Sequence, residues 1–221
     1  MVLSDPFDNI NNEVYLEKIK GLFYKFKVWI ISTIILLVLV SLTITFYSNY
    51  KKKEVITISD YYIKILSIID EDPNRAKDEL KKLAKLNNKN YQKLSNLLVF
   101  KLSFESKNYV EALKSLDIIK KNTKSNNDMN KVLDYYYAQV YLEQNNIENF
   151  NFHIGELLSY SGMWALLAHE LRGHLYFSKK EYDNALKNFN KIVNNQQASM
   201  PIKNRALEMI DSITLYYEKD S

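Results

Sequence analysis

The chain has 221 residues with 4 Gly, 3 Pro and no Cys, and its formal net charge is +4. So few structure-breaking residues argue against sandwiches, barrels and glycine-loop nucleotide folds, and favour long helices joined by polar turns. The lack of Cys excludes disulfides, cysteine nucleophiles and Cys-ligated zinc or iron–sulfur sites, and the small net charge gives no argument for a nucleic-acid partner.

The first predicted element is an apolar helix near the start of the chain. No charged residue occurs between Val28 and Tyr50, and aromatic residues stand at both ends of this stretch. A helix of about 20 residues spans roughly 30 Å, the thickness of the hydrocarbon core of a bilayer. We therefore predict a transmembrane helix at residues 28–50, preceded by a tail at residues 1–27.

Two alternatives exist for this stretch: a buried core helix and a cleaved signal peptide. Soluble core helices rarely lack charge over such a length. Signal peptides have a shorter apolar run and a small-residue cleavage site, and no such site follows here. Four lysines lie within about 20 residues of the apolar stretch on each side, so the positive-inside rule leaves the orientation open.

Residues 51–221 are predicted to be helical throughout and to contain a repeat. The pattern Tyr-x-x-Ala-Leu-Lys occurs twice, with its alanines at Ala112 and Ala185, which are 73 residues apart. That distance is about twice a 36-residue period. Ala76 lies one period before Ala112, and Phe150 stands where the skipped copy would place its alanine.

The last copy of this pattern is the most complete. Gly173-x-x-Tyr176 followed by Tyr182-x-x-Ala185-x-x-x-Phe189 resembles the core of a tetratricopeptide repeat, a unit of two helices. We expect Gly173 to face Ala185 where the helices cross, and Tyr176 and Phe189 to fill the space between them. One pair cannot bury its apolar stripe alone, so we predict an all-α solenoid of stacked pairs.

Cap and turn signals give the approximate helix boundaries. Asp72-Pro73 is a helix cap followed by proline at the first helical position. Ser178-x-x-Glu181 fits a capping box, and Pro201 opens a final helix. The predicted helices form four pairs and a closing helix, near residues 55–70, 73–86, 90–105, 108–121, 129–144, 147–159, 162–178, 181–194 and 201–217.

No catalytic, metal or cofactor motif is found. His169-Glu170 resembles the start of a zinc-protease helix, but the next histidine is His174, at the fifth position instead of the fourth, so the two imidazoles diverge. The four glycines are not spaced as in a phosphate loop. We therefore predict no enzyme activity and no cofactor; an enzyme with a degenerate site is the alternative.

Three consecutive tyrosines, residues 135–137, point in three directions on one predicted helix. Either Tyr135 and Tyr137 line a groove that binds apolar peptide, or they belong to the core between repeats. Charge is also uneven, with +7 over residues 51–131 and −3 over residues 132–221. This predicts contact of the basic half with anionic membrane lipid, or reflects a drift in composition.

Three further patterns carry a family resemblance: Ser4-Asp5-Pro6-Phe7-Asp8 before the anchor, Met163-Trp164-x-x-x-Ala168-x-Glu170-Leu171-x-Gly173, and Pro201-x-x-x-Arg205-Ala206. With them, nearly the whole chain resembles the small bacterial inner-membrane proteins of the YfgM type, ancillary subunits of the Sec translocon, especially the alphaproteobacterial ones. The resemblance implies a cytoplasmic tail at residues 1–27, an inner-membrane helix at 28–50 and a periplasmic repeat domain at 51–221.

The resemblance also implies a function without catalysis. It implies an adaptor beside the translocon, whose protein partners are translocon subunits, secreted chains or periplasmic chaperones. Two departures from the pattern stand out: Phe150 replaces a small residue, and residues at the position of Gly173 are usually larger. A scaffold in envelope assembly or cell division, using the same repeats, is the alternative function.

Overall fold

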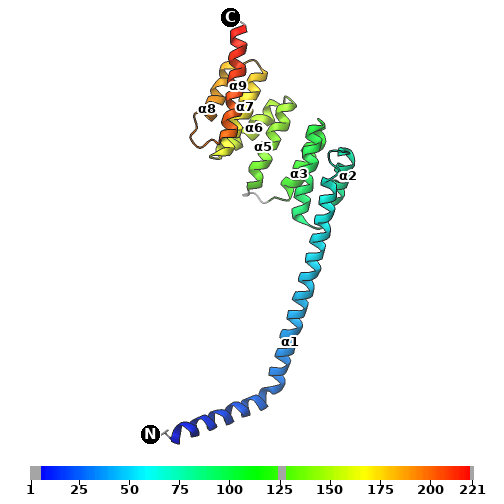
Figure 1. Cartoon of the computed structure of the whole chain (residues 1–221), viewed down its shortest axis with the longest axis vertical. Helices are drawn as coiled ribbons and strands as arrows, with labels where there is room; N and C mark the ends of the chain where they lie inside the picture. The colour runs from blue at the N-terminus through cyan, green and yellow to red at the C-terminus, as the bar shows by residue number, and fades with distance from the viewer. Residues whose placement is uncertain (1–5, 124–127, 220–221) are drawn as a thin grey trace. The chain divides into compact units, whose positions relative to one another are not determined.

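The computed structural model describes residues 6–123 and 128–219, except for some side chains near the two ends. Every element in these ranges is an α-helix (Figure 1). This confirms the predicted all-α fold class. The chain divides into two compact units, residues 1–61 and 62–221. Ser4 and Asp5, and the end of the predicted turn before Asp128, lie outside the described residues.

The first helix, α1 (Pro6–Leu66), is continuous and joins the apolar stretch to the helix expected at 55–70. The sequence contains no glycine or proline between Gly21 and Pro73, so nothing interrupts the helix there. By length and composition, α1 includes one segment, Tyr24–Leu66, that could cross a membrane. Every side chain from Ile31 to Tyr50 is exposed.

Over its described residues, the second unit contains the end of α1 and eight further helices, which follow one another in chain order (Figure 1). The strongest contacts join neighbours as pairs, α3 with α4, α5 with α6 and α7 with α8. We call α3, α5 and α7 the first helices, and α4, α6 and α8 the second helices. The bounds are α2 (Pro73–Leu83), α3 (Lys89–Glu105), α4 (Tyr109–Lys121), α5 (Asp128–Glu143), α6 (Ile147–Ser159), α7 (Met163–Ser178), α8 (Tyr182–Val193) and α9 (Met200–Lys219).

The turn from first to second helix has the same backbone in all three pairs. Lys107, Asn145 and Lys180 have positive φ angles of 58°, 53° and 60°. In each turn the next amide donates a hydrogen bond to the carbonyl five residues earlier, at 2.8–2.9 Å. This is the helix-ending motif that usually carries glycine. The repeat is therefore preserved in the backbone although the sequence has lysine or asparagine there.

The capping box predicted for α8 does not form. Ser178 is the last residue of α7, and its hydroxyl donates to the Leu175 carbonyl. Glu181 is the N-cap residue but makes no side-chain cap hydrogen bond. By contrast, the cap at Asp72 forms as predicted, with its side chain accepting from the Arg75 amide. The left-handed turn at Lys180 places Ser178 on the wrong side of the break to act as a cap.

The four repeat positions found in the sequence lie at one structural position. Ala76, Ala112, Phe150 and Ala185 each stand four residues after the N-cap of their helix, α2, α4, α6 and α8 respectively. All four are fully buried. Complete burial restricts the space at this position, and three of the four residues there are small.

At this position the two helices of a pair carry residues of complementary size. The facing position of the first helix lies seven residues before the positive-φ residue. In one pair the first helix carries the large residue, and Phe100 packs in a cluster with Ala112 of the second helix. In the next pair the second helix carries the large residue, and Phe150 packs in a cluster with Ala138 of the first helix. The large Phe150 is accommodated because its first helix carries alanine.

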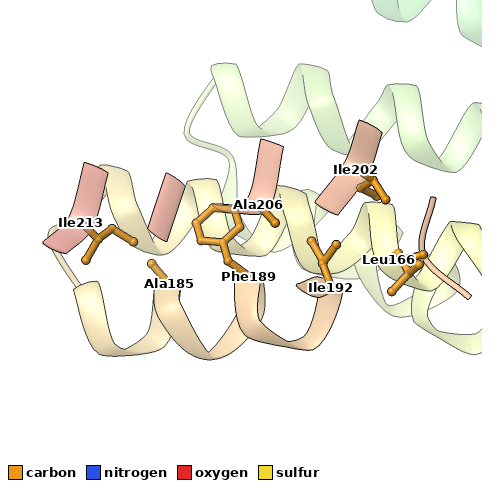
Figure 2. Packing of buried hydrophobic residues seen from close by; sticks show 8 residues of the cluster. Leu166, Ala185, Phe189, Ile192, Ile202, Ala206 and Ile213 are labelled. Carbon is orange, nitrogen blue, oxygen red and sulfur yellow. The ribbon is translucent and has the colours of Figure 1, made fainter. Parts of the chain in front are cut away.

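Gly173 occupies the same position in α7, but its nearest neighbour differs from the one expected. A Cβ atom at Gly173 would lie 2.6 Å from the ring of Phe189, and Ala185 is not among its nearest contacts. Figure 2 shows Phe189 between Ala185 and Ile192 on α8, close to Ala206 of α9. The ring of Phe189 is fully buried, so it has little room to move.

The carboxylate of Glu111 joins α2, α3 and α4 through ion pairs and a hydrogen bond. The Glu111 carboxylate of α4 lies 3.0 Å from Nζ of Lys77 and 2.5 Å from Nζ of Lys81, both on α2. It also accepts a hydrogen bond from the Ser103 hydroxyl of α3 at 3.2 Å. Burial alone would raise the pKa of Glu111, but hydrogen bonds and charge from the two lysines outweigh it and lower the pKa to about 2.

We expect Gly173→Ala to destabilise the full chain by about 1–3 kcal/mol, because the new methyl group overpacks against Phe189. The matched control is Gly155→Ala in α6, where a Cβ atom meets nothing within 4 Å. There the better helix propensity of alanine is expected to stabilise by up to about 1 kcal/mol. Urea unfolding followed by circular dichroism in detergent micelles measures both. Equal changes in the free energy of unfolding for the two substitutions would contradict the close packing of Gly173 against Phe189.

We expect Glu111→Gln to flatten the dependence of stability on pH in acid. The pKa of Glu111 is lower in the folded chain than its usual 4.5, so its contribution is complete above pH 4.5 and is lost as the pH falls toward about 2. The free energy of unfolding should therefore fall more steeply in the wild type than in the variant over that range. The control is Glu148→Gln, an exposed carboxylate of α6; identical slopes for the wild type and Glu111→Gln would be the contrary result.

Candidate partner-binding groove

The first helices α3 and α5 and the end of α1 enclose a hollow of about 410 Å³. Tyr62 of α1 and Tyr136 of α5 contribute its aromatic walls, and Leu97 and Phe104 are among the α3 side chains that line it. The α3 residues lie three, four or seven positions apart, which places them on one face of the helix. The lining is mostly apolar.

A second hollow of about 540 Å³ continues from the first across α5 and α7. Phe104 and Gln139 line both hollows, so the two adjoin at these side chains. The second hollow is further lined by Leu142 and Glu143 of α5 and, on α7, by Leu171, His174 and Ser178. Together they form one groove over α3, α5 and α7, which we call the first-helix groove.

The groove forms because the first helices α3, α5 and α7, which line it, alternate along the chain with the second helices, which do not. Each second helix returns the chain, so α3, α5 and α7 run in the same direction and present equivalent faces. Aromatic contacts connect these faces: the rings of Phe100 and Tyr136 are 4.6 Å apart between centroids, and those of Phe100 and Phe104 are 5.8 Å apart. The groove wall is thus continuous with the core below it.

Of the three consecutive tyrosines, only Tyr136 lines the groove. Tyr137 is 4% exposed, its hydroxyl donates to Asp117 at 2.6 Å, and its ring stacks on His153. Burial and this hydrogen bond raise the pKa of Tyr137. Tyr135 packs against the neighbouring core cluster, and its hydroxyl accepts a hydrogen bond from Gln139.

Of the two alternatives that the sequence left open for Tyr135 and Tyr137, these placements agree with the core between repeats. Tyr137 lies in the core, and Tyr135 reaches the groove only through its bond to Gln139. The rotation of about 100° per residue turns the three adjacent side chains in different directions, and here Tyr136 is the one that lines the groove. The sequence showed that the three point apart, but not which one faced solvent, because that depends on how α5 is packed.

The other repeat residues lie in the last core cluster. Phe189 and Ala185 are fully buried, and Tyr176 and Tyr182 are partly buried against them. The ring of Tyr182 also stacks on Tyr216 of α9, with centroids 5.7 Å apart. These side chains therefore hold α7, α8 and α9 together and do not line the groove.

The three histidines have separate environments. Nδ1 of His153 is 2.9 Å from Asp134, and Nδ1 of His169 is 3.1 Å from Asn188. His174 lines the groove and packs edge-on against Phe189, and burial lowers its pKa. Among the residues whose positions are described, no group of three acidic or histidine side chains could hold a metal ion.

An ion pair that the sequence reasoning missed joins α7 to the closing helix α9. Nε of Arg205 donates to Oε1 of Glu170 at 2.6 Å and Nη2 donates to Oε2 at 3.0 Å. The Glu170 side chain is 8% exposed, so its charge depends on this two-pronged contact. Both residues belong to the patterns that carried the resemblance, but nothing in their spacing showed that they would meet.

A comparison with protein families agrees with this geometry. The family model described as a tetratricopeptide repeat-like domain matches residues 20–213, which includes both the apolar stretch and the helical array. No curated protein and no solved structure matches the chain significantly. Domains of this kind typically mediate protein–protein interactions and are not catalytic. The chain belongs to the family of tetratricopeptide repeat-like domains.

Proposed function

We propose that this protein is a membrane-anchored adaptor that binds other polypeptides in the first-helix groove. The observation that carries the proposal is the groove itself, whose two hollows adjoin at Phe104 and Gln139 and are lined by side chains of all three first helices. The apolar lining of its first hollow, with aromatic walls at Tyr62 and Tyr136, suits apolar side chains of a bound chain. Adaptor function needs such a surface and no catalytic group.

The anchor is the apolar part of α1, which we place in the membrane at residues 28–50, with residues 1–27 on one side and residues 51–221 on the other. Its support is the run of exposed apolar side chains between Ile31 and Tyr50. Exposing so much apolar surface to water would be costly, and a bilayer removes that cost. Confinement to the membrane raises the effective concentration of the repeat array near membrane partners, so a low affinity of the groove for these partners would suffice.

We further propose that the partners are subunits of the Sec translocon, secreted chains or periplasmic chaperones, and that the array lies on the periplasmic side of a bacterial inner membrane. This finer assignment rests on the sequence resemblance to the YfgM-type ancillary subunits. The alternative is a scaffold in envelope assembly or cell division, which would use the same groove for other partners.

Photo-crosslinking from the groove tests the adaptor function. A photoreactive amino acid in place of Tyr136 or Leu94, both in the groove, should capture polypeptides when the full chain is expressed in bacterial cells. The control position is Val110, which is 78% exposed on α4 and does not line the groove. Translocon subunits or secreted chains captured only from the groove would support the translocon assignment.

Other results of this experiment have definite meanings. Capture of envelope-assembly or division proteins from the groove would favour the scaffold alternative. Equal capture from Tyr136 and Val110 would contradict a binding role for the groove.

Protease digestion of intact spheroplasts tests the orientation. If residues 51–221 are periplasmic, external protease should digest them and leave a protected fragment that contains residues 1–50. The control is a cytoplasmic protein of the same cells, which must stay intact. Protection of the array until the membrane is permeabilised would place it in the cytoplasm and reject the translocon assignment on the periplasmic side.

A further inference from the structure

The first-helix groove has an acidic margin. Glu105 is the last residue of α3 and Glu143 is the last residue of α5, and both line the groove. Because the first helices run in the same direction, these ends lie along the same edge of the array. None of the first helices has a basic residue in its last turn.

Helix stability does not account for these carboxylates. The carboxyl end of a helix carries a partial negative charge, which favours lysine or arginine there and disfavours acids. Helices α2, α4 and α8 follow this rule, with lysines in their last turns. Helices α3 and α5 each end on a glutamate that borders the groove, whereas α6, which also has a glutamate and no basic residue in its last turn, does not line the groove.

The two carboxylates differ in how far they are neutralised. Lys101 lies 3.8 Å from Glu105, an exposed pair one helical turn apart. Glu143 has no ion pair among the described residues, and its contact is the hydroxyl of Tyr109, which donates to it at 3.4 Å. Burial lowers the pKa of the neighbouring His174, so that this side chain is neutral at pH 7 and does not offset Glu143. Glu143 is thus a negative charge without an ion-pair partner among the described residues, and it lies beside Leu142 in a hollow of mixed polar and apolar lining.

These features select one kind of occupant. The two hollows adjoin at Phe104 and Gln139, so one bound chain can contact both. The apolar lining of the first hollow suits apolar side chains, and the second hollow adds polar side chains such as Glu143. An uncompensated carboxylate at a helix carboxyl end repels phosphate, which disfavours nucleic acids and anionic lipid headgroups. A polypeptide with lysine or arginine beside an apolar run satisfies both the lining and the charge.

We propose that Glu143 is a specificity-determining residue, and that the groove prefers polypeptide segments in which a lysine or arginine adjoins a run of apolar residues. The inference rests on the proposed adaptor function and adds the class of segment bound. Glu143 sits beside Leu142, which also lines the second hollow, so apolar and charged side chains of one segment can be held at neighbouring points.

The test uses the full chain in nanodiscs of uncharged lipid and three fluorescent peptides with the same apolar run, flanked by lysine, glutamine or glutamate. Anisotropy is measured against empty nanodiscs to subtract partition into lipid. The wild type should bind the lysine-flanked peptide most tightly. Glu143→Gln should weaken that binding about two- to five-fold, as expected for an exposed charge pair, and leave the glutamine-flanked peptide unchanged. Added salt should reduce the wild-type preference.

The matched control is Glu148→Gln, which also removes one negative charge. Glu148 is exposed in the first turn of α6, five residues after Glu143, and does not line the groove. It should bind all three peptides as the wild type does. An equal loss of affinity for the lysine-flanked peptide in Glu143→Gln and Glu148→Gln would overturn the proposal, because the preference would then depend on the net charge of the protein. Equal binding of the three peptides by the wild type would overturn it and leave the adaptor function intact, whereas no binding of any peptide would reject both.

Discussion

The packing of the two helices within each pair is the constraint on which the rest of this structure depends. Within each pair, a large buried residue of one helix packs with a small residue of the other. Phe100 meets Ala112, and Ala138 accommodates Phe150. In the last pair, Gly173 leaves the space that the ring of Phe189 fills. If both helices carried large residues, the pair would open and the neighbouring pairs would lose the surface on which they stack.

The groove follows from this packing together with the repeated turn. The left-handed residue at the end of each first helix reverses the chain in the same way three times, so α3, α5 and α7 run in the same direction. Their outer faces are then equivalent, and apolar side chains on them add up to a surface that no single pair possesses. The ion pair between Glu170 and Arg205 attaches the closing helix to the last of these first helices.

The charges show which features serve stability and which do not. The Glu111 carboxylate, held by two lysines of α2, joins three helices and is explained by the fold alone. The lysines at the ends of α2, α4 and α8 are explained by the helix dipole. Glu143 has neither explanation, and its position beside the groove is the reason to assign it a role in recognition.

The sequence by itself determined the all-α class, the apolar stretch and most helix boundaries, because these depend on local composition, periodicity and caps. It also located the repeat position at Ala76, Ala112, Phe150 and Ala185. Only the tertiary structure decided that Tyr136 and not Tyr137 lines the groove, that Gly173 lies against Phe189, and that Arg205 meets Glu170. Each of these depends on the rotation and spacing of packed helices, which residues distant in the chain fix together and no local pattern contains.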